Sequence, residues 1–94
     1  MRVNRVEIFS DKSNAAVLRH PERRFPGVLL QGDTLYGMCQ AADQAYSAAR
    51  GVIEQDQYEE LNDLRNHLWE LLVHYKQVLV EHNIPLPFVE APRA

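Results

Sequence analysis

The feature of this sequence that most limits its fold is a pair of apolar repeats in the second half. In each repeat, apolar residues recur at alternating intervals of three and four. The two runs are Leu35, Met38, Ala42, Ala45, Ala49 and Val52, and Leu61, Leu64, Leu68, Leu71, Tyr75 and Val78. This alternation is typical of helices that pack along a shared seam. Alanines on one helix allow close approach to leucines on the other, so the sequence predicts an antiparallel helical hairpin over residues 33–83.

Local signals place the link between the two predicted helices. Gly51 suits the left-handed residue that often follows a helix. Asp56 suits an N-cap, because its carboxylate can accept a hydrogen bond from the first turn, and Glu59 follows three residues later. We therefore expect the link within residues 51–56.

Prolines mark the end of the second helix. Pro85 and Pro87 lack the backbone N–H that a helix requires, so we expect the helix to end near Asn83. The remaining residues, 84–94, form a proline-rich tail. Its apolar side chains should lie extended against the core, and its last residues, 92–94, should fray. The apolar tail residues are Ile84, Leu86 and Phe88.

The first third of the chain predicts a small β element. Val6 and Ile8 alternate with charged residues, as in a half-buried strand. Two further short strands are predicted over residues 15–19 and 27–31, separated by turn-forming residues and by Pro21. We therefore predict a single α+β domain over residues 1–94. In it, a small N-terminal β element (residues 1–32) packs on the long antiparallel helical hairpin, and the tail follows.

Charge is divided unevenly along the chain. Residues 1–24 hold six basic and three acidic side chains, whereas the remainder holds four basic and ten acidic ones. Such asymmetry can orient a protein toward a charged partner. The total formal charge of −3 argues against general nucleic-acid binding, which depends on neutralising phosphates.

Other bulk properties bear on the compartment. The chain has no apolar stretch of the length that a membrane helix needs, and its N-terminus carries charges instead of an apolar signal region. One cysteine, Cys39, cannot form an internal disulfide, which suits a reducing environment. We therefore expect a cytoplasmic protein that does not bind membranes.

The segment RRFPGVLLQGDTL, residues 23–35, holds the candidate binding residues. Guanidinium groups that lie close together can bind a carboxylate or phosphate, or can pair with the chain's own acids. Asp33 has two alternative roles: it can cap the helix that follows, or it can belong to an anion or ligand site at the strand–helix junction. The candidate residues are Arg19, Arg23, Arg24, Gln31 and Asp33.

No catalytic or metal signature is complete. His67 and His74 share a helix face with carboxylates four residues before each, but the Glu-x-x-His and H-E-x-x-H patterns are absent. Cys39 has no nucleophile signature around it, and no glycine–lysine phosphate loop occurs. We therefore expect no catalytic residues, no metal and no cofactor.

A second apolar stripe predicts self-association. Trp69, Leu72 and Leu79 lie off the predicted seam. Small helical domains often recover missing burial by pairing with another chain. We therefore predict a homodimer that buries this stripe in a four-helix arrangement.

The run VEIFSDKSNAAVLRHPERRFPGVLLQGDTLYGM resembles a family of small bacterial proteins of unknown function, in which an RRFPG–QGD–helix segment opens a short chain. The resemblance supplies no catalytic residues. Small acidic proteins of this kind include immunity proteins that neutralise toxins, and the analogy favours a non-catalytic interaction protein, immunity- or antitoxin-like, that binds a protein partner through charged surfaces. The alternative is a small ligand-binding or hydrolytic protein that uses the Arg23–Asp33 segment.

Overall fold

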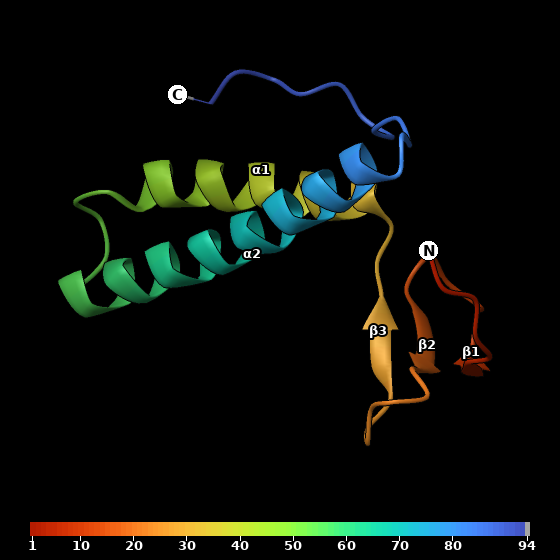
Figure 1. Ribbon diagram of the computed structural model, residues 1–94. Helices are drawn as coiled ribbons and strands as arrows, with labels where there is room; N and C mark the ends of the chain where they lie inside the picture. The colour runs from red at the N-terminus through yellow and green to blue at the C-terminus, as the bar shows by residue number, and fades with distance from the viewer. Residues whose placement is uncertain (94) are drawn as a thin grey trace. The chain divides into compact units, whose positions relative to one another are not determined.

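The computed structural model describes residues 1–93 and divides the chain into two compact units, Met1–Gln31 and Gly32–Ala94. The first unit is a three-stranded antiparallel sheet, and the second is a pair of packed helices (Figure 1). The predicted α+β fold is therefore confirmed. The unit boundary also divides the charge, because residues 25–31 carry none: the sheet unit is basic and the helical unit is acidic.

The sheet has the order β1-β2-β3 and consists of short strands. Strand β1 (Glu7–Ser10) pairs with β2 (Ala16–Arg19), which pairs in turn with β3 (Gly27–Leu29). Turn-forming residues separate β1 from β2, and Pro21 and Pro26 lie between β2 and β3, where they remove no donor from a central strand. All three predicted strands are present, and each is at most four residues long.

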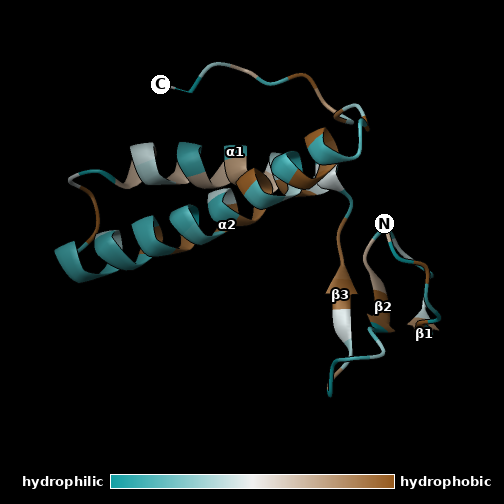
Figure 2. Cartoon of the chain, in the orientation of Figure 1, coloured by the Kyte–Doolittle hydropathy of each residue, from teal (hydrophilic) through white to brown (hydrophobic). Residues whose placement is uncertain are grey.

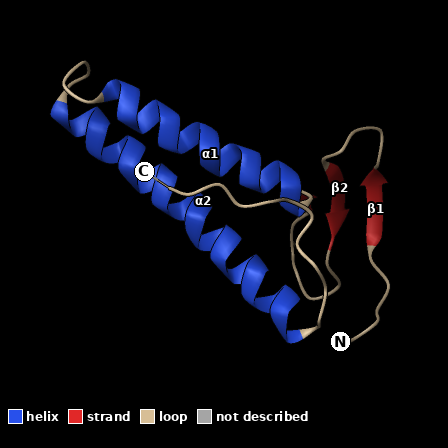
Figure 3. Ribbon diagram, turned by 90° about the horizontal axis from the view of Figure 1, so that it is seen from above, coloured by secondary structure: helices blue, strands red, loops and turns tan. Residues whose placement is uncertain are grey.

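The two helices form an antiparallel hairpin. Helix α1 is Gly32–Ala49 and helix α2 is Gln55–Glu81, whose 27 residues span about 40 Å. Contacts run in opposite directions along the pair. The ring of Tyr46 stacks on that of Tyr58 near the link, and the ring of Tyr75 lies against Gly32 at the other end. Figures 1 and 3 show the same arrangement from two directions.

The seam between the helices lies partly in a different register from the predicted one. One heptad position of each helix is as predicted and at least half-buried: Leu35, Ala42 and Ala49 on α1, and Leu61, Leu68 and Tyr75 on α2. The other position lies one residue later than predicted. It consists of Cys39 and Tyr46 on α1, and Arg65, Leu72 and Leu79 on α2.

The residues predicted for that second position are exposed instead. They are Met38 and Ala45 on α1, and Leu64, Leu71 and Val78 on α2. Val52 was also assigned to the seam, but it lies in the exposed link after α1. Leu72 and Cys39 have no exposed surface, whereas 59% of Leu71 is exposed. The prediction that Leu72 and Leu79 belong to a second stripe off the seam was also wrong, because both lie in the intrachain core.

Backbone conformation, more than side-chain hydrogen bonds, shapes the ends of the helices. Gly51 has φ of +72°, which confirms its predicted left-handed role. Asp56 is not the N-cap of α2. That position is Glu54, whose side chain makes no capping hydrogen bond, and Asp56 lies in the first turn. Its charge there still suits the positive end of the helix dipole.

The C-terminus of α2 closes in a Schellman turn. Asn83 adopts φ of 55°, and its backbone N–H donates to the Val80 carbonyl over 3.2 Å. The backbone N–H of Ile84 donates to the Leu79 carbonyl over 2.9 Å. Asparagine tolerates this left-handed conformation better than most residues, and Pro85 follows directly. The turn redirects the chain, and the tail runs back along the hairpin (Figures 1 and 3).

Apolar residues recur along α2, interrupted by polar ones (Figure 2). Within the part of the chain that the structure describes, neither helix is long and apolar enough to cross a membrane.

Candidate functional site

The most elaborate polar cluster of the described residues surrounds Asp43 in the middle of α1. Its Oδ1 atom accepts hydrogen bonds from the indole Nε1 of Trp69 over 3.0 Å and from Nη1 of Arg65 over 3.3 Å. Both donors come from α2, where they are four positions apart (i and i+4), so they project from the same helix face. The carboxylate thus joins the two helices near the middle of the hairpin.

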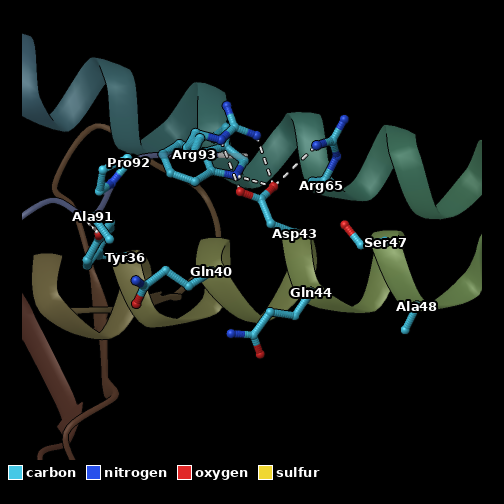
Figure 4. A pocket seen from close by; sticks show the side chains of 11 residues that line it. Tyr36, Gln40, Asp43, Gln44, Ser47, Ala48, Arg65, Ala91, Pro92 and Arg93 are labelled. Carbon is cyan, nitrogen blue, oxygen red and sulfur yellow. Dashed lines mark hydrogen bonds and ion pairs between the residues drawn. The ribbon is translucent and has the colours of Figure 1, made fainter.

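Arg93 of the tail completes this cluster (Figure 4). Its Nε atom donates to Oδ2 of Asp43 over 3.0 Å, and its Nη2 atom donates to Oδ1 over 2.9 Å. The guanidinium carbon also lies 3.9 Å from the ring centroid of Trp69. A bidentate pair backed by an aromatic face is a geometry that arginine provides and lysine does not. The predicted fraying of residues 92–94 is therefore wrong for Arg93, and Ala94 lies outside the described residues.

These contacts set the charge of the site. Hydrogen bonding from Arg93 is the largest influence on Asp43, and it holds the pKa of that carboxyl below its usual range against the opposing effect of burial. Trp69 and Arg65 act in the same direction. Asp43 is therefore ionised at neutral pH and remains an acceptor for all three donors.

A cleft of about 640 Å³ opens beside the cluster. Helix α1 supplies Gln40, Gln44, Ser47 and Ala48, which lie along the cleft in Figure 4. Helix α2 supplies Arg65 and Trp69, and residues 91–93 of the tail form another wall. Amide, hydroxyl and guanidinium groups therefore line this cleft, together with an indole.

Cys39 lies one turn before Asp43 and is fully buried. Burial is the main cause that raises the pKa of its thiol, and the negative charge of Asp43 raises it further. The sulfur is therefore a neutral core atom at physiological pH and not a nucleophile. Among the described residues, no group of three or more His, Cys, Asp or Glu side chains could hold a metal ion.

The residues predicted to bind a partner are distributed over both units. Arg19 is engaged internally: Glu7 lies opposite it in the sheet, and Oε1 of Glu7 accepts from the guanidinium over 2.6 and 3.0 Å. Arg23 and Arg24 are exposed in the loop before β3, and the guanidinium of Arg24 lies 5.2 Å from the ring centroid of Phe25. Gln31 is exposed immediately before α1.

Asp33 is neither the N-cap nor part of an assembled site. Helix α1 begins at Gly32, one residue before it, so Asp33 belongs to the first turn. Its Oδ1 atom accepts from the backbone N–H of Thr34 over 2.9 Å. The carboxylate is exposed and placed at the positive end of the helix dipole, which is a stabilising position.

Little in the sequence pointed to the Asp43 cluster. Fifty residues separate Asp43 from Arg93, and no local pattern relates them. The one usable signal was a charged residue inside the alanine-rich helix, which requires a partner when that helix packs against another.

The three-stranded sheet and the two packed helices define a small α+β protein. The chain belongs to a family of unknown function, DUF6959, whose model matches residues 1–88. Neither the curated proteins nor the solved structures contain a match to this chain. The resemblance to a family of unknown function is thus confirmed, and it brings no activity or substrate with it. Asp43, Arg65 and Trp69 lie inside the matched residues, and Arg93 lies beyond them.

Proposed function

We propose that this chain is a non-catalytic interaction protein that forms a homodimer and binds a protein partner, in the manner of immunity or antitoxin proteins. The observation that carries the proposal is an apolar surface on the hairpin, here called the open face. It consists of Met38 and Ala45 on α1, and Leu64, Leu71 and Val78 on α2, all of them exposed.

The open face lies on the side of the hairpin away from the tail. Each open-face residue comes directly before a seam residue in the sequence, as Leu71 precedes Leu72. The residues that contact the tail come directly after a seam residue of the other set, as Trp69 follows Leu68. Successive helix residues are about 100° apart, so the two sets flank the seam on opposite sides.

The spacing of the open face on α2 suits a second copy of the same helix. Leu64, Leu71 and Val78 recur every seven residues, the repeat by which helices pair. In an antiparallel pair with a two-fold axis at Leu71, Leu64 of one copy lies opposite Val78 of the other. A two-fold interface uses the same patch on both copies, so this self-complementary stripe meets its requirement.

The uneven distribution of charge along the chain supports the proposal that it binds a protein partner. The sheet unit has a formal excess of basic residues, and its Arg23 and Arg24 are exposed, whereas the helical unit is acidic. Oppositely charged surfaces favour fast and selective encounter with a complementary protein.

Sedimentation equilibrium at micromolar concentration tests the dimer. We expect twice the 10.9 kDa chain mass for the wild type and the chain mass for Leu71→Glu, because a carboxylate at the centre of the interface would be buried without a partner. Val73→Glu is the matched control, since Val73 is also an exposed apolar residue of α2 but lies off the open face. A wild-type protein that remains at 10.9 kDa would refute the dimer.

A further inference from the structure

The tail, residues 84–93, is held to the hairpin by a row of specific contacts. The ring of Phe88 stacks on that of Tyr36 with centroids 4.3 Å apart and an interplanar angle of 11°. The Glu90 carboxylate pairs with Lys76, and the backbone N–H of Ala91 donates to the Tyr36 hydroxyl over 2.6 Å. Arg93 makes the bidentate pair with Asp43 described above.

These contacts define a recognition groove, made of Tyr36 and Asp43 on α1 and of Trp69 and Lys76 on α2. Together these residues meet four chemical features of the tail. Tyr36 contacts an aromatic ring and a backbone N–H, and Lys76 pairs with a carboxylate. Asp43 and Trp69 both contact the guanidinium. Because the tail has no helix or strand beyond the Schellman turn, the groove reads an extended segment. The pattern that it reads is an aromatic residue, an acid two positions later and an arginine three positions after that.

Part of the groove is held by contacts that do not involve the tail. Arg65 and Trp69 both donate to Asp43, so its carboxylate has two donors besides Arg93. The Arg65 guanidinium is itself fixed by Oδ1 of Asn62, over 2.8 and 3.2 Å, and by the ring of Tyr46, 4.2 Å from its carbon. A site whose side chains are positioned in advance binds a ligand with less loss of conformational freedom.

The tail covers the groove without being buried in it. About 46% of the Arg93 side chain and 41% of the Glu90 side chain are exposed, and ion pairs so exposed contribute little to stability. Only the Phe88 ring packs against the core. A competing segment therefore needs to displace the aromatic stack, the hydrogen bond from Ala91 to Tyr36, and two exposed ion pairs, together with the contact of Arg93 with Trp69.

The cleft beside Asp43 offers contacts to a ligand longer than the tail. Gln44 and Ser47 line it on α1, and Ser47 lies one turn beyond Asp43, the residue that Arg93 contacts. A peptide that continues beyond its arginine can therefore bond their amide and hydroxyl groups, which adds contacts that residues 84–93 do not make.

We propose that this groove is a peptide-binding site and that the tail occupies it in the free protein. Its ligand is an extended segment of a protein partner with the pattern aromatic–x–acid–x–x–arginine. Charge complementarity assigns this chemistry, because Lys76 selects the acid and Asp43 the arginine. The inference deepens the proposed interaction function by naming the partner's chemistry. It uses the side of the hairpin opposite the open face, so the two proposals can fail separately.

The test uses the full chain and a labelled synthetic peptide, IPLPFVEAPR, with an amidated C-terminus. In the Arg93→Asp chain, Asp43 repels the end of the chain's own tail, which therefore competes less strongly for the groove. We expect fluorescence anisotropy to show this chain binding the peptide at least tenfold more tightly than the wild type does. Circular dichroism checks that each variant keeps its helices.

Charge reversal supplies the matched control. The Asp43→Arg chain also loses its own tail contact, but its groove should bind this peptide at least tenfold more weakly than the Arg93→Asp chain does. A second peptide ending in aspartate should reverse the preference. Equal affinity for both chains, or no binding to Arg93→Asp at millimolar peptide, would overturn the proposal.

A second copy's tail is the competing occupant. The Leu71→Glu chain, in which the open face is disrupted and the groove and tail are unchanged, tests for it by native mass spectrometry. We expect monomers. A dimer that disappears when Arg93→Asp is added would show that tails exchange between copies and would refute the assignment to a separate partner.

Discussion

Gly32 is buried at the start of α1 because the ring of Tyr75 lies where a side chain would be. A Cβ at this position would overlap the far end of that ring. Tyr75 is itself half-buried in the seam, so the ring cannot move away without disturbing its own packing. The glycine of the QGD segment therefore allows the close packing of α1 against the ring of Tyr75.

A double-mutant cycle tests this explanation. Gly32→Ala should cost roughly 1–3 kcal/mol in the free energy of unfolding, as overpacking does. In a Tyr75→Ala background the same substitution should cost much less, so urea titration should give a coupling energy above ~0.5 kcal/mol. Gly37→Ala is the control: nothing lies within 4 Å of the point where its Cβ would be, and it should stabilise α1 by up to ~1 kcal/mol. Equal costs of Gly32→Ala in both backgrounds would contradict the close approach.

At the scale of the helices, the register of the seam decides which apolar residues hold the chain together. Each helix carries three adjacent columns of apolar residues, and only two of them can face the other helix. On α2 the column of Leu72 and Leu79 is in the core, and the column of Leu64 and Leu71 is not. Neighbours in sequence thus have different roles.

Adjacent leucines should respond differently to truncation. Leu72→Ala should cost about 2–5 kcal/mol at any protein concentration, because it leaves a cavity in the intrachain core. Leu71→Ala should matter only through the proposed dimer, so its cost should fall to within ~0.5 kcal/mol as the protein is diluted. Urea titrations at two concentrations a hundredfold apart measure both. A large cost of Leu71→Ala that does not change on dilution would place Leu71 in the intrachain core.

At the scale of the whole molecule, the helical unit is closed by a contact between chain segments far apart in sequence. Arg93 reaches the middle of α1 because the Schellman turn at Asn83 sends the tail back along the hairpin. The contact depends on the ionised form of Asp43, whose pKa Arg93 holds below its usual value of 3.8. A carboxyl with a lowered pKa in the folded state stabilises that state fully above its unfolded pKa.

Acid should therefore break the contact between Arg93 and Asp43. The stabilisation is complete above about pH 4 and is lost as the pH falls through the lowered pKa of Asp43. Trp69 is the only tryptophan, so its fluorescence reports departure of the Arg93 guanidinium. A Glu90→Gln background removes the tail carboxylate that pairs with Lys76, so that its protonation does not contribute. The acid step should disappear in Arg93→Gln, and a step that persists there would exclude the Asp43–Arg93 pair as its origin.

The sequence by itself determined the number, type and order of the elements, because these depend on local properties. Period-two alternation, the prolines and the 3–4 repeats act over a few residues, and each predicted strand and helix is present. Gly51 was also predictable, since its left-handed conformation depends on the absence of its own side chain.

Tertiary structure alone decided the register of the seam and the composition of the site. The columns of Met38 and Cys39 both complete a 3–4 repeat with Leu35, so the choice between them depends on what the second helix and the tail cover. Asp43, Trp69 and Arg93 come together only when α2 packs on α1 and the tail folds back. Such contacts depend on how distant parts of the chain fold together, and short-range sequence patterns do not specify this.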